Sequence, residues 1–511
     1  MSSRRSGILI PLFSAPSERS WGIGDIGDLS HLTSWLAGAG QRVLQILPIN
    51  EMAPSQQSPY SAISAMAIDP IYVDVGAIQE FAEVGFGSTG DIATLEEVRR
   101  APKVEYAAIR DLKQRALRIA FARFVEAQVR AGSGRARNFS AFLTGQAWWI
   151  DEYAIFRAIH FSQDERPWTE WPEPLRRRDP EALADARRSL AEEIMFRQYV
   201  QWIAHSQWME ARQAAGDVAL FGDLPFMVDG DSADVWARQG QFHLDVSLGV
   251  PPDAFSDTGQ DWGMPVYRWE AIAADDFRWL RERARRTSDL YDGYRIDHLV
   301  GFYRTYGRPL SGAPPFFTPE KEADQIALGE RLMQIFGGTG ADIIAEDLGV
   351  VPDFVRSSLA GLGLPGFRVF RWERYWHGEG QPFVDPADYL TTSVATSGTH
   401  DTETLAVWWD GAGTNERAQV AALESMRAVT GGSEVGQDAL LEVLMASASN
   451  LVLFPVQDVF GWRDRINEPG TVNDRNWTFR LPWPSNRMAE VPAARERQAV
   501  LRGWAQKYRR L

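Results

Sequence analysis

Residues 342–349 read DIIAEDLG, a short apolar run that ends in two adjacent carboxylates. Seven similar runs that end in polar residues recur along the 511 residues. Such runs are typical of parallel strands that are buried on both faces and carry functional groups at their carboxyl ends. Eight strands with helical spacers predict an α/β fold, a (β/α)8 TIM barrel. The predicted strands are residues 7–12, 42–47, 219–224, 293–296, 342–345, 366–369, 393–396 and 451–455.

The spacing of apolar residues changes between about residues 76 and 216. Leu117, Phe121 and Phe124 lie three and four apart in a long charged stretch, which predicts amphipathic helices. This stretch is too long for a simple connection between strands, so we expect a helical subdomain inserted after the second strand. A smaller insertion, rich in Pro and Phe, is expected at about 303–330 after the fourth strand. The whole chain, 1–511, is otherwise predicted to be one barrel domain without a separate C-terminal β domain.

Composition excludes several classes of partner and cofactor. Lys and Arg number 53 against 68 Asp and Glu, and a net charge of -15 disfavours nucleic acid and anionic membranes. The chain has no Cys, and no window approaches the roughly 20 apolar residues of a membrane span. The sequence GIGDIG at 22–27 resembles a dinucleotide-binding loop, but it does not follow its strand directly. We therefore expect a cytoplasmic protein with no cofactor and no metal.

Three predicted strands are followed by carboxylates, namely Asp297, Glu346 and Asp401. Active sites of barrel enzymes lie at these carboxyl ends, and a carboxylate pair suits cleavage of a glycosidic bond. Arg295 shares a strand face with Asp297 and is expected to keep it ionised. Neighbouring acids are expected to raise the pKa of Glu346, as a proton donor requires. Asp401 and His400 remain to bind sugar hydroxyls and to stabilise positive charge on the ring.

Further motifs extend this interpretation along nearly the whole chain, and VPPDAFSDTGQDWGMP at 250–265 is the most specific of them. With these motifs the chain resembles the 4-α-glucanotransferases, the amylomaltases or disproportionating enzymes of glycoside hydrolase family 77. The resemblance implies transfer of α-1,4-glucan segments between maltooligosaccharides through a covalent intermediate. The other matching segments are WGIGDIGDL at 21–29, SPY at 58–60, SA at 64–65, GDLP at 222–225, DSADVW at 231–236, QD at 457–458 and NEPGT at 467–471.

The resemblance also implies roles for individual residues. Asp297 would be the nucleophile, Glu346 the general acid and base, and Asp401 the stabiliser of the transition state. Arg295 and His400 would line the donor subsite. The resemblance further implies a sugar-stacking aromatic at Tyr60 and acceptor-side residues at Asp231, Gln260 and Trp262. A retaining enzyme of this kind is expected to hold its two reacting carboxyl groups about 5 to 6 Å apart.

Two positions depart from the family pattern. Ala254 stands where some members carry an aromatic over the cleft, which weakens the expectation of a tight grip on long or cyclic glucans. Asp69 precedes Pro70 where many members show Asn-Pro. Two alternatives stay open on sequence alone: a retaining α-glucan hydrolase with the same carboxylates, and a catalytically silent glycan-binding protein.

Overall fold

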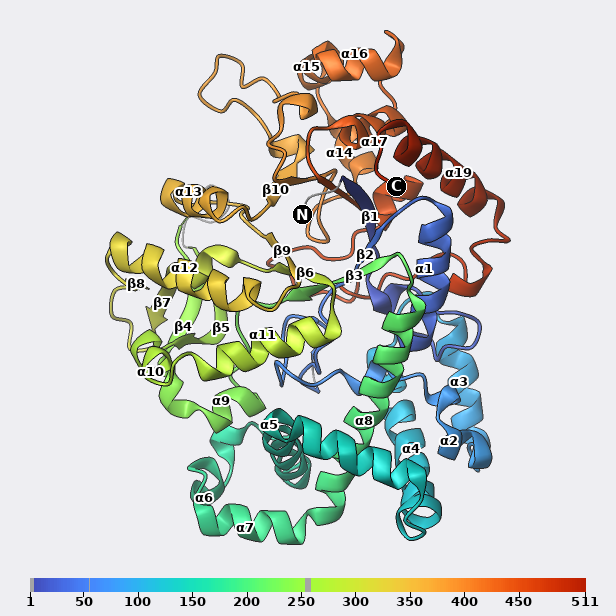
Figure 1. Ribbon diagram of the computed structural model, residues 1–511, viewed down its shortest axis with the longest axis vertical. Coiled ribbons are helices and arrows are strands. Elements are labelled where there is room, and N and C mark those ends of the chain that lie inside the picture. Colours follow the sequence, from blue (N-terminus) through green and yellow to red (C-terminus); the bar gives the residue numbers. More distant parts are fainter. Residues whose placement is uncertain (1–3, 55, 253–258) are drawn as a thin grey trace.

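The computed structural model describes residues 4–54, 56–252 and 259–511, and its centre is a closed barrel of eight parallel strands (Figure 1). The order around the barrel is β1-β12-β11-β10-β9-β6-β3-β2, so the first strand of the chain pairs with the last. The predicted (β/α)8 fold is confirmed. The barrel strands are β1 (Arg5–Leu9), β2 (Val43–Gln45), β3 (Ala219–Leu224), β6 (Gly293–Ile296), β9 (Asp342–Ala345), β10 (Gly366–Val369), β11 (Ser393–Thr396) and β12 (Leu451–Pro455).

Six barrel strands have the predicted bounds, whereas the first two differ. The first was predicted at 7–12, but β1 begins at Arg5 and ends at Leu9. Pro11 has no N–H to donate to a neighbouring strand, and the chain continues as a short 3-10 helix, Leu12–Ser14. The second was predicted at 42–47, but β2 covers only Val43–Gln45, and residues 46–49, which include Pro48 without an N–H to donate, have no regular secondary structure.

Side chains fill the barrel interior. The barrel is therefore a packed core, and its functional surface lies at the ends of its strands, as is usual for this fold. The residues of this interior cluster are Val43, Phe221, Ile344, Phe367, Val369, Val394, Leu451 and Leu453.

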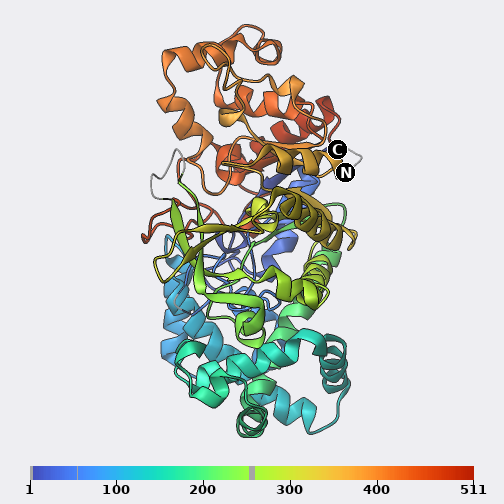
Figure 2. The same ribbon diagram turned by 90° about the vertical axis from the view of Figure 1, so that its left-hand side faces the viewer.

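Helices cover the outside of the barrel and extend from it at both ends of the molecule (Figures 1 and 2). After β12 the described chain forms helices and turns, with no further strand. None of the helices in the described ranges is long and apolar enough to cross a membrane. Outside the connection from β2 to β3, the helices are α1 (Leu29–Gly38), α9 (Ala233–Ala237), α10 (Trp269–Ala274), α11 (Arg278–Leu290), α12 (Glu322–Gly337), α13 (Asp353–Gly361), α14 (Leu405–Gly411), α15 (Thr414–Ala422), α16 (Glu424–Thr430), α17 (Gln437–Ala446), α18 (Val456–Phe460) and α19 (Pro492–Lys507).

In its described part, the connection from β2 to β3 contains seven α-helices, which extend to the lower end of the molecule in Figures 1 and 2. Phe124 packs against both Tyr199 and Trp202, so an aromatic cluster joins α4 (Tyr106–Phe124) to α8 (Ala191–Ala214). These helices are α2 (Gln79–Val84), α3 (Thr89–Arg100), α4 (Tyr106–Phe124), α5 (Gly134–Ser162), α6 (Glu173–Arg176), α7 (Pro180–Ser189) and α8 (Ala191–Ala214).

A second sheet of four antiparallel strands lies outside the barrel, in the order β5-β4-β7-β8. The stretch at about 303–330 was expected only as an irregular insertion, but it contributes two of these strands and the start of α12. The first of them pairs with a segment some sixty residues earlier, the second pairs with the first, and local sequence patterns do not reveal such long-range pairing. The strands are β4 (Phe242–Val250), β5 (Gln260–Tyr267), β7 (Thr305–Pro309) and β8 (Phe316–Thr318).

Candidate active site

The barrel register places the predicted carboxylates next to one another. Ile296 of β6 pairs with Ala345 of β9, so the residues that follow them, Asp297 and Glu346, leave adjacent strands at the same level. Asp401 follows the end of β11 on the same rim of the barrel. The structure thus brings together side chains that are more than a hundred residues apart in the sequence.

Arg295 holds three carboxylates around one buried guanidinium group, with only 5% of the residue exposed. Its Nη1 donates to both oxygens of Asp223, at 2.9 and 2.7 Å. Its Nη2 lies 2.7 Å from Asp297 Oδ1 and 4.0 Å from Glu346 Oε2. The sum of these last two distances limits the gap between those two oxygens to about 6.7 Å. This limit is close to the roughly 5 to 5.5 Å of retaining glycosidases and at the lower end of the roughly 6.5 to 9.5 Å of inverting ones.

Glu346 is held so that it can carry a proton near neutral pH. Its two oxygens accept hydrogen bonds from the backbone N–H groups of His298 (2.7 Å) and Leu348 (2.9 Å). Burial raises the pKa of Glu346 to about 7, the nearby Arg295 opposes this rise, and the negative charge of Asp297 adds to it. A carboxyl group with such a pKa can act both as a proton donor and as a proton acceptor.

In contrast to Glu346, Asp401 has an environment that lowers its pKa. Burial alone would raise its pKa, but the charge of His400 and hydrogen bonds from His400 and Asn467 lower the pKa of Asp401 to about 2. Asn467 Nδ2 donates to Oδ1 at 2.7 Å, and His400 Nε2 lies 3.2 Å from Oδ2. Asp401 therefore stays ionised at neutral pH and places a fixed negative charge on the rim.

Tyr60 reaches this cluster from the loop after β2. Its hydroxyl donates to Asp223 Oδ2 at 2.8 Å and lies 3.1 Å from His400 Nε2. Its ring stacks on the His400 imidazole with centroids 5.4 Å apart, and Trp477 packs against both rings. Sequence reasoning did not select Asp223 or Trp477, although Asp223 lies on the strand beside Arg295 and could have been found by the same strand-end argument.

The three residues predicted for the acceptor side lie outside this contact network. Trp262 packs edge-on against the His298 ring at 4.8 Å, and its Nε1 donates to Gln260 Oε1 at 3.0 Å. Asp231 is instead bonded to the helical connection between β2 and β3. Its Oδ2 lies 3.0 Å from His160 Nε2, and its Oδ1 accepts the backbone N–H of Trp168 at 2.9 Å.

Of the two positions that depart from the family pattern, the structure describes only one. Ala254 lies outside the described residues. Asp69 is fully buried and forms an ion pair with Arg110 at 3.0 Å. One oxygen of Asp69 also accepts the backbone N–H of Met52, and the other accepts that of Ile71. The carboxylate thus joins two loop segments to α4, which an uncharged amide could do only in part.

We expect Asp69→Asn to lower the free energy of unfolding by about 1 to 3 kcal/mol, because an amide leaves one buried backbone N–H without an acceptor. Urea unfolding measures this change. Asp217→Asn, at an exposed carboxylate paired with Arg42, is the matched control and should change the stability little. Equal stabilities of the Asp69 variant and the unsubstituted chain would show that this ion pair has no structural role.

Within the described residues, no three His, Asp or Glu side chains gather in an arrangement that could hold a metal ion. The site instead consists of carboxylates placed at the carboxyl ends of parallel barrel strands. Together, the closed barrel and this site define a TIM-barrel enzyme of the kind that works with paired acids.

Comparison with known proteins identifies the family. The family model described as 4-alpha-glucanotransferase matches residues 10–486, and the chain belongs to this family. The 4-alpha-glucanotransferase of Thermus thermophilus is 33% identical, with 94% of this chain and 95% of that protein covered. That of Chlamydia pneumoniae is 31% identical, with 94% and 91% covered. The structure of amylomaltase from Streptococcus agalactiae in complex with acarbose has a TM-score of 0.84 and 28% identity and covers 99% of both chains. The predicted family is therefore confirmed.

Proposed function

We propose that this enzyme cleaves an α-1,4 bond in a maltodextrin and transfers the released segment to the 4-hydroxyl group of a second glucan, with retention of configuration. The observation that carries this proposal is the position of Asp297 and Glu346 around Arg295. Asp297 forms an ion pair with the Arg295 guanidinium, whereas burial raises the pKa of Glu346 to about 7. This difference separates a nucleophile from an acid.

In the proposed first step, Asp297 attacks the anomeric carbon of the donor while Glu346 gives its proton to the departing glycosidic oxygen. The bond to the leaving segment breaks, and a bond from the anomeric carbon to Asp297 forms. In the second step, Glu346 takes the proton from the acceptor hydroxyl group, whose oxygen displaces Asp297. The two steps regenerate both carboxyl groups in their starting states.

The neighbouring residues have supporting roles in this proposal. The fixed charge of Asp401 stabilises the positive charge that develops on the sugar ring in both transition states. Arg295, His400 and Tyr60 line the donor side, where the stacked rings offer an aromatic surface to a sugar. Asp231, Gln260 and Trp262 are assigned to the acceptor side. Trp262 lies beside His298, whose backbone N–H binds Glu346.

Incubation with maltotriose tests the proposed reaction. We expect longer oligosaccharides together with glucose, at a constant total of reducing ends, because each cleaved bond is replaced by a new one. A steady rise in reducing ends would identify a hydrolase. Absence of any product with maltotriose and with longer maltodextrins would identify a glycan-binding protein without catalysis.

The pKa of Glu346 predicts the dependence of the reaction on pH. Because this pKa is raised to about 7, the acid is protonated below that pH and loses its proton as the pH rises through it. We expect kcat/KM for transfer to fall about tenfold per pH unit above about pH 7, since kcat/KM reports the free enzyme. Initial rates with maltotriose at subsaturating concentration measure this profile. A kcat/KM that stays level up to about pH 9 would contradict the role of Glu346 as the acid.

A further inference from the structure

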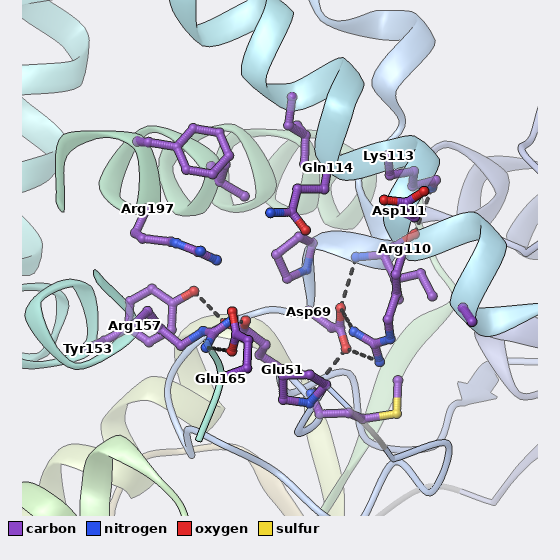
Figure 3. Close-up of a pocket in the computed structure, with 18 residues that line it drawn as sticks. Glu51, Asp69, Arg110, Asp111, Lys113, Gln114, Tyr153, Arg157, Glu165 and Arg197 are labelled. Carbon is purple, nitrogen blue, oxygen red and sulfur yellow. Dashed lines mark hydrogen bonds and ion pairs between the residues drawn. The ribbon is translucent and has the colours of Figure 1, made fainter. Parts of the chain in front are cut away.

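A cavity separate from the site around Arg295 lies within the helical connection between β2 and β3 (Figure 3). Its volume is about 320 Å³, and its walls come from α4, α5, α8 and the loops around residues 51–54 and 69–71. This volume is at the lower end of the range of small-molecule sites, which is about 300 to 1,000 Å³. The site around Arg295 and this cavity have different lining residues, so a ligand here would not compete directly with donor sugar.

The acidic side chains on opposite walls are already paired with arginines. Glu51 Oε1 lies 2.9 Å from Arg157 Nε, and Glu165 Oε2 lies 2.8 Å from Arg157 Nη1. On the other side, Asp69 pairs with Arg110. Glu51 and Glu165 thus share Arg157, whereas Asp69 and Arg110 neutralise each other. A further cationic group lines the same cavity.

That group is Arg197 of α8, whose guanidinium points into the cavity (Figure 3). Only 6% of this residue is exposed. Its Nε donates to Glu193 at 2.7 Å, but its buried Nη2 has no hydrogen-bond partner among the described residues. Burial and the charge of Arg157 both lower the pKa of Arg197. A buried cationic donor without a partner costs free energy, which a bound anion would recover.

The rest of the lining limits the kind of anion. Among the residues that the structure describes, Arg110 Nε is a second buried donor without a partner, and the Gln114 amide points into the cavity (Figure 3). The paired carboxylates can accept hydrogen bonds from hydroxyl groups but would repel a ligand with many negative charges. The Tyr153 hydroxyl is already engaged, because it donates to Glu51 and accepts from Gln201. The cavity thus suits a small molecule with one anionic group and several hydroxyl groups.

We propose that this cavity binds a monosaccharide-sized anion, with its single phosphate or carboxylate group on Arg197 and its hydroxyl groups toward Gln114 and the paired carboxylates. The anionic group pairs with the Arg197 guanidinium, since charge-assisted hydrogen bonds of this kind are the strong ones. This proposal does not depend on the reaction at Arg295, and the site can be tested by binding alone.

Isothermal titration calorimetry with glucose 6-phosphate and with gluconate tests the two possible anionic groups, and glucose is the neutral control. We expect at least one of the two anions to bind with a Kd at least tenfold below that of glucose. Arg197→Gln should raise this Kd at least tenfold. Arg188→Gln, at an exposed arginine of α7, removes the same charge away from the cavity and should leave the Kd unchanged.

A second variant covers the case in which Arg197→Gln fails to fold. Gln114→Glu keeps the shape of an exposed side chain and adds a negative charge to the cavity, so it should also raise the Kd at least tenfold. Circular dichroism and transfer from maltotriose without the anion show that the variants are intact. The proposal is overturned if neither anion binds, if glucose binds as tightly as the anions, or if a folded cavity variant binds like the unsubstituted protein.

Discussion

Asp297→Ala is expected to abolish transfer from maltotriose, with a loss of several orders of magnitude in kcat, because no covalent intermediate can form without the nucleophile. The variant should remain folded, since Arg295 keeps its two hydrogen bonds to Asp223 when its partner at position 297 is removed. Product analysis by chromatography measures the loss, and circular dichroism verifies the fold.

A matched control separates loss of the nucleophile from loss of a charge. Asp245→Asn removes an exposed carboxylate in β4 and should leave kcat unchanged. Retention of even a tenth of the original activity by folded Asp297→Ala would refute the assignment of the nucleophile. The same activity in both variants would place the reaction elsewhere in the molecule.

Glu346→Gln is expected to lose about two to four orders of magnitude in kcat with maltotriose, which is the usual contribution of a general acid. The amide keeps the size of the side chain but cannot donate an acidic proton. The loss should depend on the leaving group. A maltosyl fluoride donor needs no protonation, so formation of the covalent intermediate should be restored in this variant and not in Asp297→Ala.

Rates with the fluoride donor decide whether Glu346 is the general acid. The second step still lacks its base in Glu346→Gln, so the rate of fluoride release in a first turnover is the appropriate measurement. If fluoride were released equally slowly by both variants, Glu346 would have a positional role instead of a protonating one. If the Glu346 variant retained full activity with maltotriose, another residue would be the acid.

The barrel could be predicted because each of its strands is locally visible. A buried parallel strand is a short apolar run, and six of the eight runs match strands residue for residue. The antiparallel sheet of β4, β5, β7 and β8 could not be predicted in the same way. Its strands pair through register shifts and include half-exposed residues, so their apolar pattern is weak.

The candidate site likewise contains residues that local sequence patterns reveal and residues that they do not. Asp297, Glu346 and Asp401 were predictable because strand ends meet at one rim of a barrel. The partners of Asp231 were not, since His160 and Trp168 come from a helix and a turn more than sixty residues earlier in the chain. Trp477 was missed for a related reason, because it reaches the Tyr60 ring from an irregular loop without a periodic pattern.

The pairing of β1 with β12 also determines when the barrel can close during translation. β1 gains its second neighbour only when residues 451–455 have been made. At about 5 to 20 residues per second, the roughly 440 intervening residues take roughly 20 to 90 s to translate. During that interval the earliest strand has an open edge, and open edges pair readily with other chains. Prematurely terminated polypeptides of this sequence would therefore be aggregation-prone clients of chaperones, and they would have no working catalytic rim.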